Sequence, residues 1–354
     1  MKKHGADIVY LPMSSYGSPL SIPDLASKLI QNGLLCPNAD ERRLIEQRLH
    51  SVSYHRLEEY SWPYRNPIPG SSTARTSQFK SGCTIGLIWS TYIFDRRLRM
   101  LLMDAIERFE VAWKNNVTQV LVEASGVNNP QTDLTLLPKF AATDMQGVSR
   151  MERWLKKANE AFAECKDVRI EHCRQVHGTT DVVDLPLWIL MELLTFGAVR
   201  KLYDAMDTLL QQEVATKMGA ELGVLNGSVK LLHQVRNCCA HHSRVWNRKW
   251  SKPCKNQQTT VPLFSEKPQE SKWYCRLHNG NWKIPAQAGG WLSLRPADTA
   301  FVFLLCGYWL NHLAHTSDWK TRVERVVQPH GSLSRNATMA GFVDGWNKHP
   351  LWTS

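Results

Sequence analysis

The stretch Ser228-Val-Lys-Leu-Leu-His-Gln-Val-Arg-Asn-Cys-Cys-Ala-His-His242 predicts a helix with one polar and one mostly apolar face. Ser228 follows Gly227 and is a good N-cap residue, so we expect the helix to begin there. Side chains three or four positions apart share a helix face. The polar row contains Lys230, Gln234, Asn237 and His241, and the mostly apolar row contains Leu231, Val235, Cys238 and His242. The pattern therefore predicts that His241 faces solvent or a cleft, while His242 points toward the core.

Arg236, Asn237 and His241 form a compact set of groups suited to RNA cleavage. Histidine titrates near neutrality and can act as base or acid, and arginine stays charged and can donate two hydrogen bonds to phosphate oxygens. Such groups can cleave a phosphodiester by attack of the 2′-OH without a metal, leaving a 2′,3′-cyclic phosphate. Spacing alone leaves an alternative, in which a surface arginine precedes a histidine favoured by the helix dipole.

Four blocks of the sequence carry a resemblance to a known family. They are Val52–Tyr60; Ile93–Arg99, continuing to Ile106–Val111; Leu185–Trp188, with Glu192–Gly197; and Arg236–Asn247. In this order they resemble the Abi-like bacteriophage-resistance proteins of the AbiD/AbiF type, which carry a HEPN-type helical ribonuclease core. The resemblance implies that Arg236 and His241 are catalytic and that Asn237 orients them. His242 also satisfies the loose spacing of the family motif, so the choice of His241 rests on the helical rows.

The resemblance implies a metal-independent endoribonuclease that acts in abortive-infection phage defence. The alternative is a non-catalytic RNA-binding module of the HEPN fold, or a toxin component controlled by an RNA or protein antitoxin. The reaction needs both a proton acceptor and a proton donor, whereas one motif supplies a single histidine. We therefore expect a homodimer in which a twofold axis brings two motif helices together. In a monomer, His55 would be the source of the missing group.

Two acidic residues are candidates for supporting roles. Glu110 lies beside an otherwise apolar helical row, and Glu192 lies within the apolar run Ile189–Leu194. A buried charge must be paired, or its burial is costly. Either carboxylate could reach the cleft of Arg236 and His241, where His242 would also support the site from the core row. The alternative, favoured for Glu110 and left open for Glu192, is a structural ion pair with Arg97, Arg200 or Lys201.

Basic and aromatic residues could bind the RNA backbone, which would fit the formal net charge of +11. The candidates are Lys230, Arg244, Arg248, Lys249, Tyr54 and Arg56. Helix C-capping is the alternative for the residues after His242, and a structural role is the alternative for the block around His55. Aromatic residues interleaved with cations in 252–285 could stack on bases. Packing of Trp273, Tyr274 and Trp282 on the helical body is the favoured alternative there.

Hydrophobic periodicity predicts a mainly α protein, and the resemblance implies a HEPN-like helical bundle at its centre. We expect a helical N-terminal segment over 1–65, the HEPN-like core over 84–250, and a C-terminal extension with irregular and helical parts over 251–354. The expected helices cover 21–32, 39–51, 53–61, 85–123, 146–176, 187–206, 297–313 and 317–327. The helix 187–206 should kink at Gly197, and 66–82 should be an exposed loop.

Cysteine usage and hydropathy predict a cytoplasmic protein without a metal or cofactor. The nine cysteines are odd in number and mostly scattered, which favours a reducing compartment over a disulfide framework. The chain begins without a secretory signal, and its longest apolar run, Ala300–Leu310, is too short to span a bilayer. The sequence contains no Cys-x-x-Cys pair, and the cysteines and histidines of 165–177 lack the spacing of a structural zinc site.

Overall fold

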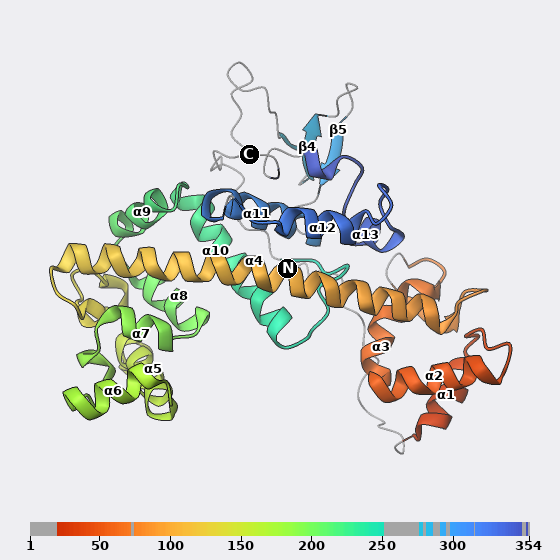
Figure 1. The fold of residues 1–354 in the computed structure, drawn as a ribbon, viewed down its shortest axis with the longest axis horizontal. Helices are drawn as coiled ribbons and strands as arrows, with labels where there is room; N and C mark the ends of the chain where they lie inside the picture. Colours follow the sequence, from red (N-terminus) through yellow and green to blue (C-terminus); the bar gives the residue numbers. More distant parts are fainter. Residues whose placement is uncertain are drawn as a thin grey trace. The chain divides into compact units, whose positions relative to one another are not determined.

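The computed structural model describes residues 20–71, 74–250, 298–314, 316–348 and Trp352, together with the backbone of three strands within 276–294. Over these residues the protein is mainly α-helical, as predicted (Figure 1). It divides into two compact units that share the helix α4 (Ile85–Ser125). Unit 1 contains the chain up to Met100 and returns for Arg244–Lys249, and unit 2 contains the remainder. The boundary inside α4 differs from the predicted boundaries at 65 and 84.

Unit 1 is built from three short helices, a small antiparallel strand pair and the start of α4. These elements are α1 (Ile22–Gln31), α2 (Ala39–Ser51), α3 (Tyr54–Ser61), β1 (Arg65–Pro67) and β2 (Arg75–Phe79). The side chains of Ser21 and Asn38 accept backbone N–H groups and so cap α1 and α2, as their sequence positions indicated. The prediction of an exposed loop over 66–82 is wrong in part, because this segment contains β2, whose buried Phe79 pairs with Arg65.

Unit 2 consists of the remainder of α4, further helices and a small sheet. The helices are α5 (Arg150–Glu164), α6 (Val168–His177), α7 (Leu187–Leu193), α8 (Phe196–Ala205), α9 (Thr208–Lys217), α10 (Leu222–Ala240), α11 (Thr299–Leu313), α12 (Trp319–Val327) and α13 (Arg335–Met339). An antiparallel sheet is formed by β3 (Arg276–His278), β4 (Asn281–Pro285) and β5 (Trp291–Leu294). No helix among the residues described above is long and apolar enough to cross a membrane.

Two of the expected helices are interrupted, and local capping explains both interruptions. The predicted helix over 146–176 ends at Glu164 and restarts at Val168, where the Asp167 side chain accepts the Arg169 N–H. The predicted helix over 187–206 breaks at Thr195, whose side chain accepts the Ala198 N–H and caps α8. The break therefore precedes Gly197, and a capping side chain, not glycine flexibility, causes it.

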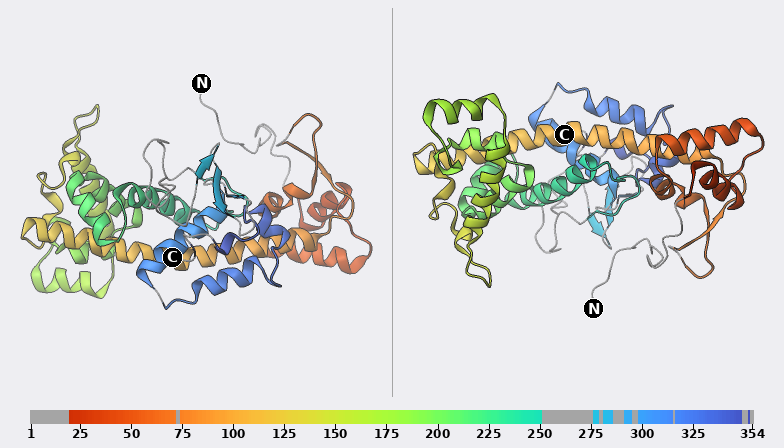
Figure 2. Two further views of the ribbon diagram at one scale, coloured as in Figure 1. Left: turned by 90° about the horizontal axis from the view of Figure 1, so that it is seen from above. Right: turned by 90° about the horizontal axis from the view of Figure 1, so that it is seen from below.

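The motif helix α10 lies beside α4 and packs against α8, α9 and α11 (Figure 2). It begins at Leu222, so Ser228 is not its N-cap residue. Ser228 is instead buried inside the helix, where its hydroxyl accepts a hydrogen bond from Trp309 Nε1 at 3.0 Å. Trp309 also packs edge-on against Phe109 of α4, with ring centroids 4.9 Å apart. The contacts with neighbouring helices therefore fix the rotation of α10 and decide which of its residues reach solvent.

Candidate functional site

The last two turns of α10 carry the predicted motif, and the two predicted rows can be compared with the structure. Lys230, Gln234 and His241 are exposed and Asn237 is half-buried, so the polar row is confirmed. Leu231, Val235 and Cys238 of the other row are buried, as expected. The rotation of α10 thus leaves Arg236, Asn237 and His241 accessible at one end of the helix.

His242 does not point into the core, so this prediction is wrong. His241 is the C-cap residue, and His242 follows it with φ +55° and is exposed. The N–H groups of His242 and Ser243 donate to the carbonyls of Cys239 and Cys238, at 3.0 and 2.9 Å. These bonds form a Schellman motif, in which the residue after the C-cap adopts the left-handed conformation. The row stops at Cys238, because the helix ends at Ala240, before His242 is reached.

Glu110 on α4 contacts the motif arginine, against the favoured sequence interpretation. Its Oε2 lies 3.9 Å from Arg236 Nε, and its Oε1 lies 3.1 Å from Lys114 Nζ. Lys114 also donates to the Leu194 carbonyl at 2.8 Å. The Glu110 side chain is 13% exposed, whereas the Arg236 side chain is 33% exposed. A distance of 3.9 Å is too long for a hydrogen bond, so the carboxylate attracts the guanidinium while leaving its N–H groups accessible.

Glu192 lies on an exposed surface, and its ion pair is formed with a residue outside the motif. The Glu192 side chain is 58% exposed, and Oε2 lies 3.7 Å from Nη1 of Arg169, at the start of α6. Both partners are well solvated, so the pair contributes little to stability. Of the two carboxylates that the sequence singled out, the structure brings Glu110, and not Glu192, to Arg236.

His233 is a second histidine of the site, and the sequence analysis did not single it out. Its Nε2 lies 3.1 Å from Asn237 Nδ2, and its Nδ1 lies 3.2 Å from Nη1 of Arg200 on α8. The ring stacks on Phe196, with centroids 5.3 Å apart. The spacing of His233 and Asn237, four residues apart on one helix, is the sequence signal that could have identified it.

Burial lowers the pKa of His233, and the positive charges of Arg200 and Arg236 lower it further. The carboxylates of Glu110 and Asp204 oppose this shift, but they do not reverse it. Near neutral pH the imidazole is therefore uncharged, so one ring nitrogen carries a proton and the other is an acceptor. The site thus combines a charged guanidinium, a neutral imidazole and an amide along one edge of α10.

In unit 1, the residues that follow the motif are held by a buried carboxylate on α4. Asp95 Oδ1 accepts the backbone N–H groups of Val245 and Trp246, at 3.0 and 2.6 Å. Its Oδ2 accepts the Tyr60 hydroxyl at 2.6 Å and pairs with Arg99. Asp95 therefore connects three of the four sequence blocks, and its hydrogen bonds hold them together within unit 1.

Arg244, a predicted RNA-binding residue, is largely engaged within the protein. Its Nε lies 3.5 Å from Glu59 Oε2, and its Nη1 donates to the Trp246 carbonyl at 2.8 Å. The side chain is 17% exposed. These partners do not belong to the end of α10, so the contacts differ from the helix C-capping named as the alternative; they connect Arg244 to α3 and to the residues that follow it. Arg248 and Lys249 are exposed in unit 1, and Lys230 is exposed on α10.

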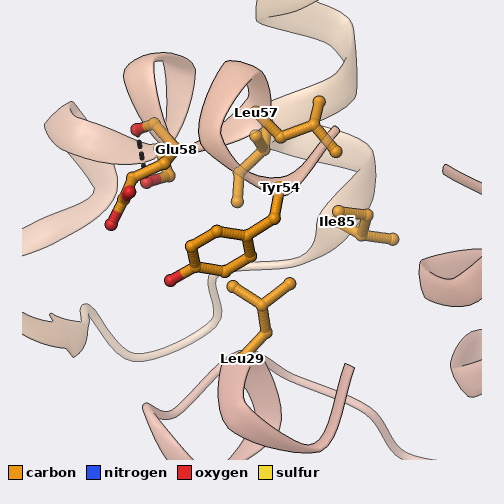
Figure 3. Close-up of a pocket in the computed structure, with 7 residues that line it drawn as sticks. Leu29, Tyr54, Leu57, Glu58 and Ile85 are labelled. Carbon is orange, nitrogen blue, oxygen red and sulfur yellow. Dashed lines mark hydrogen bonds between the residues drawn. The ribbon is translucent and has the colours of Figure 1, made fainter. Parts of the chain in front are cut away.

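Tyr54, also predicted to bind RNA, is buried in unit 1 and lines a small apolar pocket (Figure 3). Its ring lies near Leu57 of its own helix and Leu29 of α1, and Lys28 Nζ lies 5.4 Å from the ring centroid. The neighbouring His55 is 91% exposed and lies 3.9 Å from Glu58, while Arg56 is half-buried. Tyr54 therefore has a structural role, whereas RNA binding by Arg56 stays a prediction.

Two further expectations concern metals and the segment after α10. The described residues contain no group of three or more histidine, cysteine, aspartate or glutamate side chains that could hold a metal ion. Neither interpretation of 252–285, base stacking or the favoured packing of Trp273, Tyr274 and Trp282 on the helical body, is tested, because these side chains lie outside the described residues. The short strands β3 and β4 are the described part of this segment.

Comparison with known proteins identifies the family but no closer relative. The family model for Abi-like proteins matches residues 47–247, which is more than half of the chain and includes all four sequence blocks in full. No curated protein and no solved structure matches the chain. The matched residues include α4, Glu110, His233 and the whole of Arg236–His241. The chain therefore belongs to the Abi-like protein family.

Proposed function

We propose that this protein is a metal-independent endoribonuclease that acts in abortive-infection phage defence. Membership of the Abi-like family suggests the role in defence. One observation carries the chemical part of the proposal: Arg236 and His241 are both accessible at one end of α10, with Asn237 between them. Arg236 would donate to the phosphate oxygens, and Glu110 would orient it from α4. His241, the solvated helix C-cap residue, would exchange a proton with the reacting ribose.

The reaction balances without a redox partner or a metal ion. A base removes the proton of the 2′-OH, the 2′-oxygen bonds to phosphorus, and the bond to the 5′-oxygen breaks. The 5′-oxygen then takes a proton from an acid, so the products are a 2′,3′-cyclic phosphate and a 5′-hydroxyl. Arg236 and Asn237 would stabilise the charge that develops on the non-bridging oxygens.

Assembly as a homodimer is part of this proposal, because one His241 cannot be both acceptor and donor in one step. A twofold axis beside α10 would bring the polar row of two subunits together and supply a second histidine. Mixing an excess of Arg236→Ala subunits with wild-type subunits should then reduce cleavage by more than dilution alone. A strictly monomeric species with full activity, seen by light scattering at assay concentration, would contradict the dimer.

The test of the chemistry is an RNA cleavage assay with purified protein, with and without EDTA. We expect cleavage to survive EDTA and the 3′ ends to carry a cyclic phosphate, detected by mass spectrometry and by resistance to 3′-end ligation. Arg236→Ala should be inactive, and the matched control Arg153→Ala should be active, since Arg153 forms a solvated ion pair with Asp144. A divalent-metal requirement with 3′-hydroxyl products would overturn the mechanism. RNA binding without cleavage would favour the non-catalytic RNA-binding module.

A further inference from the structure

Contacts from α8 and α10 restrict the ring of His233. Phe196 stacks on one face, with an angle of 25° between the ring planes. The first turn of α8 comes so close that a Cβ atom added at Gly197 would lie 3.0 Å from Nε2. Both ring nitrogens also have polar neighbours, Arg200 at Nδ1 and Asn237 at Nε2. The imidazole is therefore held in one orientation by contacts from two helices.

Arg200 decides which ring nitrogen carries the proton. A guanidinium has five N–H donors and no acceptor, and it stays protonated in proteins. Nη1 of Arg200 lies 3.2 Å from Nδ1, so Nδ1 must accept this hydrogen bond. In a neutral imidazole the other nitrogen then carries the hydrogen. Arg200 is itself oriented by Asp204, whose Oδ2 lies 3.4 Å from its Nε.

The protonated Nε2 in turn decides how the Asn237 amide is oriented. An N–H at Nε2 needs an acceptor, and the amide group 3.1 Å away offers one only through its oxygen. The oxygen and nitrogen of an amide have nearly the same size, so half a turn about χ2 exchanges them without displacing other atoms. Asn237 Oδ1 therefore accepts from Nε2, and the NH2 group takes the opposite position.

We propose that His233 is a positioning residue: Arg200 fixes it as the Nε2–H tautomer, and Nε2–H fixes the Asn237 amide with its NH2 group turned away from the imidazole. This NH2 group then forms, with the adjacent guanidinium of Arg236, a pair of donors suited to phosphate oxygens. His233 is not the missing proton donor, because both of its nitrogens are occupied by these contacts. The role in catalysis rests on the proposed ribonuclease function. The order of donors and acceptors from Arg200 through His233 to Asn237, called the hydrogen-bond order below, does not depend on that function.

The hydrogen-bond order can be tested without any activity measurement. In protein labelled with [15N]histidine, two-bond 15N–1H correlations identify which ring nitrogen is protonated, and the His233→Gln variant assigns the His233 signals. At pH 7.5 we expect a single Nε2–H tautomer for His233. Replacing the guanidinium in Arg200→Met should produce a mixture of tautomers. An Nδ1–H tautomer in the wild-type protein, or a tautomer unchanged in Arg200→Met, would overturn the proposal.

Cleavage assays then test the positioning role. Loss of a partner that orients a functional group costs about 10–100-fold in activity in the metal sites where such partners are known, and we expect His233→Leu to fall in this range. His233→Gln should recover most of the activity, because the glutamine amide can donate in place of Nε2–H. Adding His233→Leu to Asn237→Ala should cause no further loss, since His233 acts only through the Asn237 amide. Independent, additive losses in the double variant would overturn the proposal.

These two tests separate the positioning proposal from the proposed function. If the wild-type protein does not cleave RNA, the ribonuclease proposal fails, while the tautomer result still decides the hydrogen-bond order. If it does cleave RNA but His233 is the Nδ1–H tautomer, the positioning proposal alone fails. A thermal melt of each variant identifies any loss that results from unfolding, and the conservative His233→Gln variant keeps the test decisive in that case.

Discussion

Helix α4 carries two carboxylate clusters of similar composition but very different accessibility. In unit 1, Asp95 is fully buried and pairs with Arg99, one turn further along the helix. In unit 2, Glu110 pairs with Lys114 with the same spacing and also lies near Arg236, which is 33% exposed. Both carboxylates interact with the sequence block that contains the motif: Asp95 with the backbone of Val245 and Trp246, and Glu110 with a side chain.

The two clusters differ in how completely their groups are paired. The oxygens of Asp95 accept from two backbone N–H groups and from Tyr60, so they have little capacity left for a ligand. Near Glu110, the Arg236 guanidinium is attracted at 3.9 Å but keeps donors that can reach a solvent-borne phosphate. At Asp95, hydrogen bonds to both carboxylate oxygens stabilise the fold. At Glu110, incomplete pairing leaves the Arg236 guanidinium available for binding.

The largest expected effect is the loss of cleavage in His241→Ala, at the accessible site. A general acid–base group contributes on the order of 10²–10⁴-fold to the rate, so single-turnover rates should fall by that amount while the melting temperature stays unchanged. His177→Ala is the matched control, because His177 is also an exposed histidine at a helix C-terminus. Retained activity in His241→Ala, with loss in His242→Ala, would transfer the role to His242.

The next largest effect should be a loss of stability when Asp95, the buried carboxylate of unit 1, is replaced. Asp95→Ala leaves Arg99 buried without its partner, and breaking a buried ion pair costs about 3–5 kcal/mol. Glu110→Ala should cost less, about 1–2 kcal/mol, because Lys114 keeps its bond to the Leu194 carbonyl and Arg236 stays solvated. Urea unfolding of both variants measures the two losses. Equal losses would show that the two clusters do not differ as described.

The sequence predicted those features that depend on neighbours along the chain. The apolar period predicted α4 almost to its ends, and the capping residues Ser21 and Asn38 marked the starts of two helices correctly. The rows of α10 were correct through His241. They failed at His242, because no glycine marks the left-handed residue that ends the helix.

The pairing of residues far apart in the sequence could not be predicted. A helical period shows that Glu110 lies beside an apolar row, but it does not show which cation packs against that position. The structure selects Arg236 from α10, whereas the sequence interpretation favoured cations on other segments. His233 was missed for the same reason, since its importance depends on Arg200 and Phe196 of α8.

A smaller effect is expected at the end of α10, where His242 adopts a left-handed conformation. This conformation costs a residue with a Cβ atom about 1 kcal/mol, and glycine avoids the cost. His242→Gly should therefore increase the free energy of unfolding by about 1 kcal/mol. His241→Gly is the control: its φ of −87° is ordinary, so glycine brings no such gain there. Destabilisation by His242→Gly would mean that the His242 side chain makes contacts that outweigh the backbone cost.

The smallest expected effect is the pH dependence that His233 adds to stability, because this side chain is only half-buried and solvent screens its charge. Burial and the charges of Arg200 and Arg236 lower its pKa in the folded protein, whereas in the unfolded chain it is about 6.5. The unfolded chain therefore binds more protons below that pH, so this contribution is complete above about pH 6.5 and is lost as the pH falls through the folded pKa. His233→Gln removes the titration and leaves the other histidines in place. Urea unfolding of both proteins between pH 5 and pH 8 should show the wild type losing stability relative to His233→Gln as the pH falls. A relative gain would mean that Glu110 and Asp204 dominate and that the imidazole is protonated in the folded state.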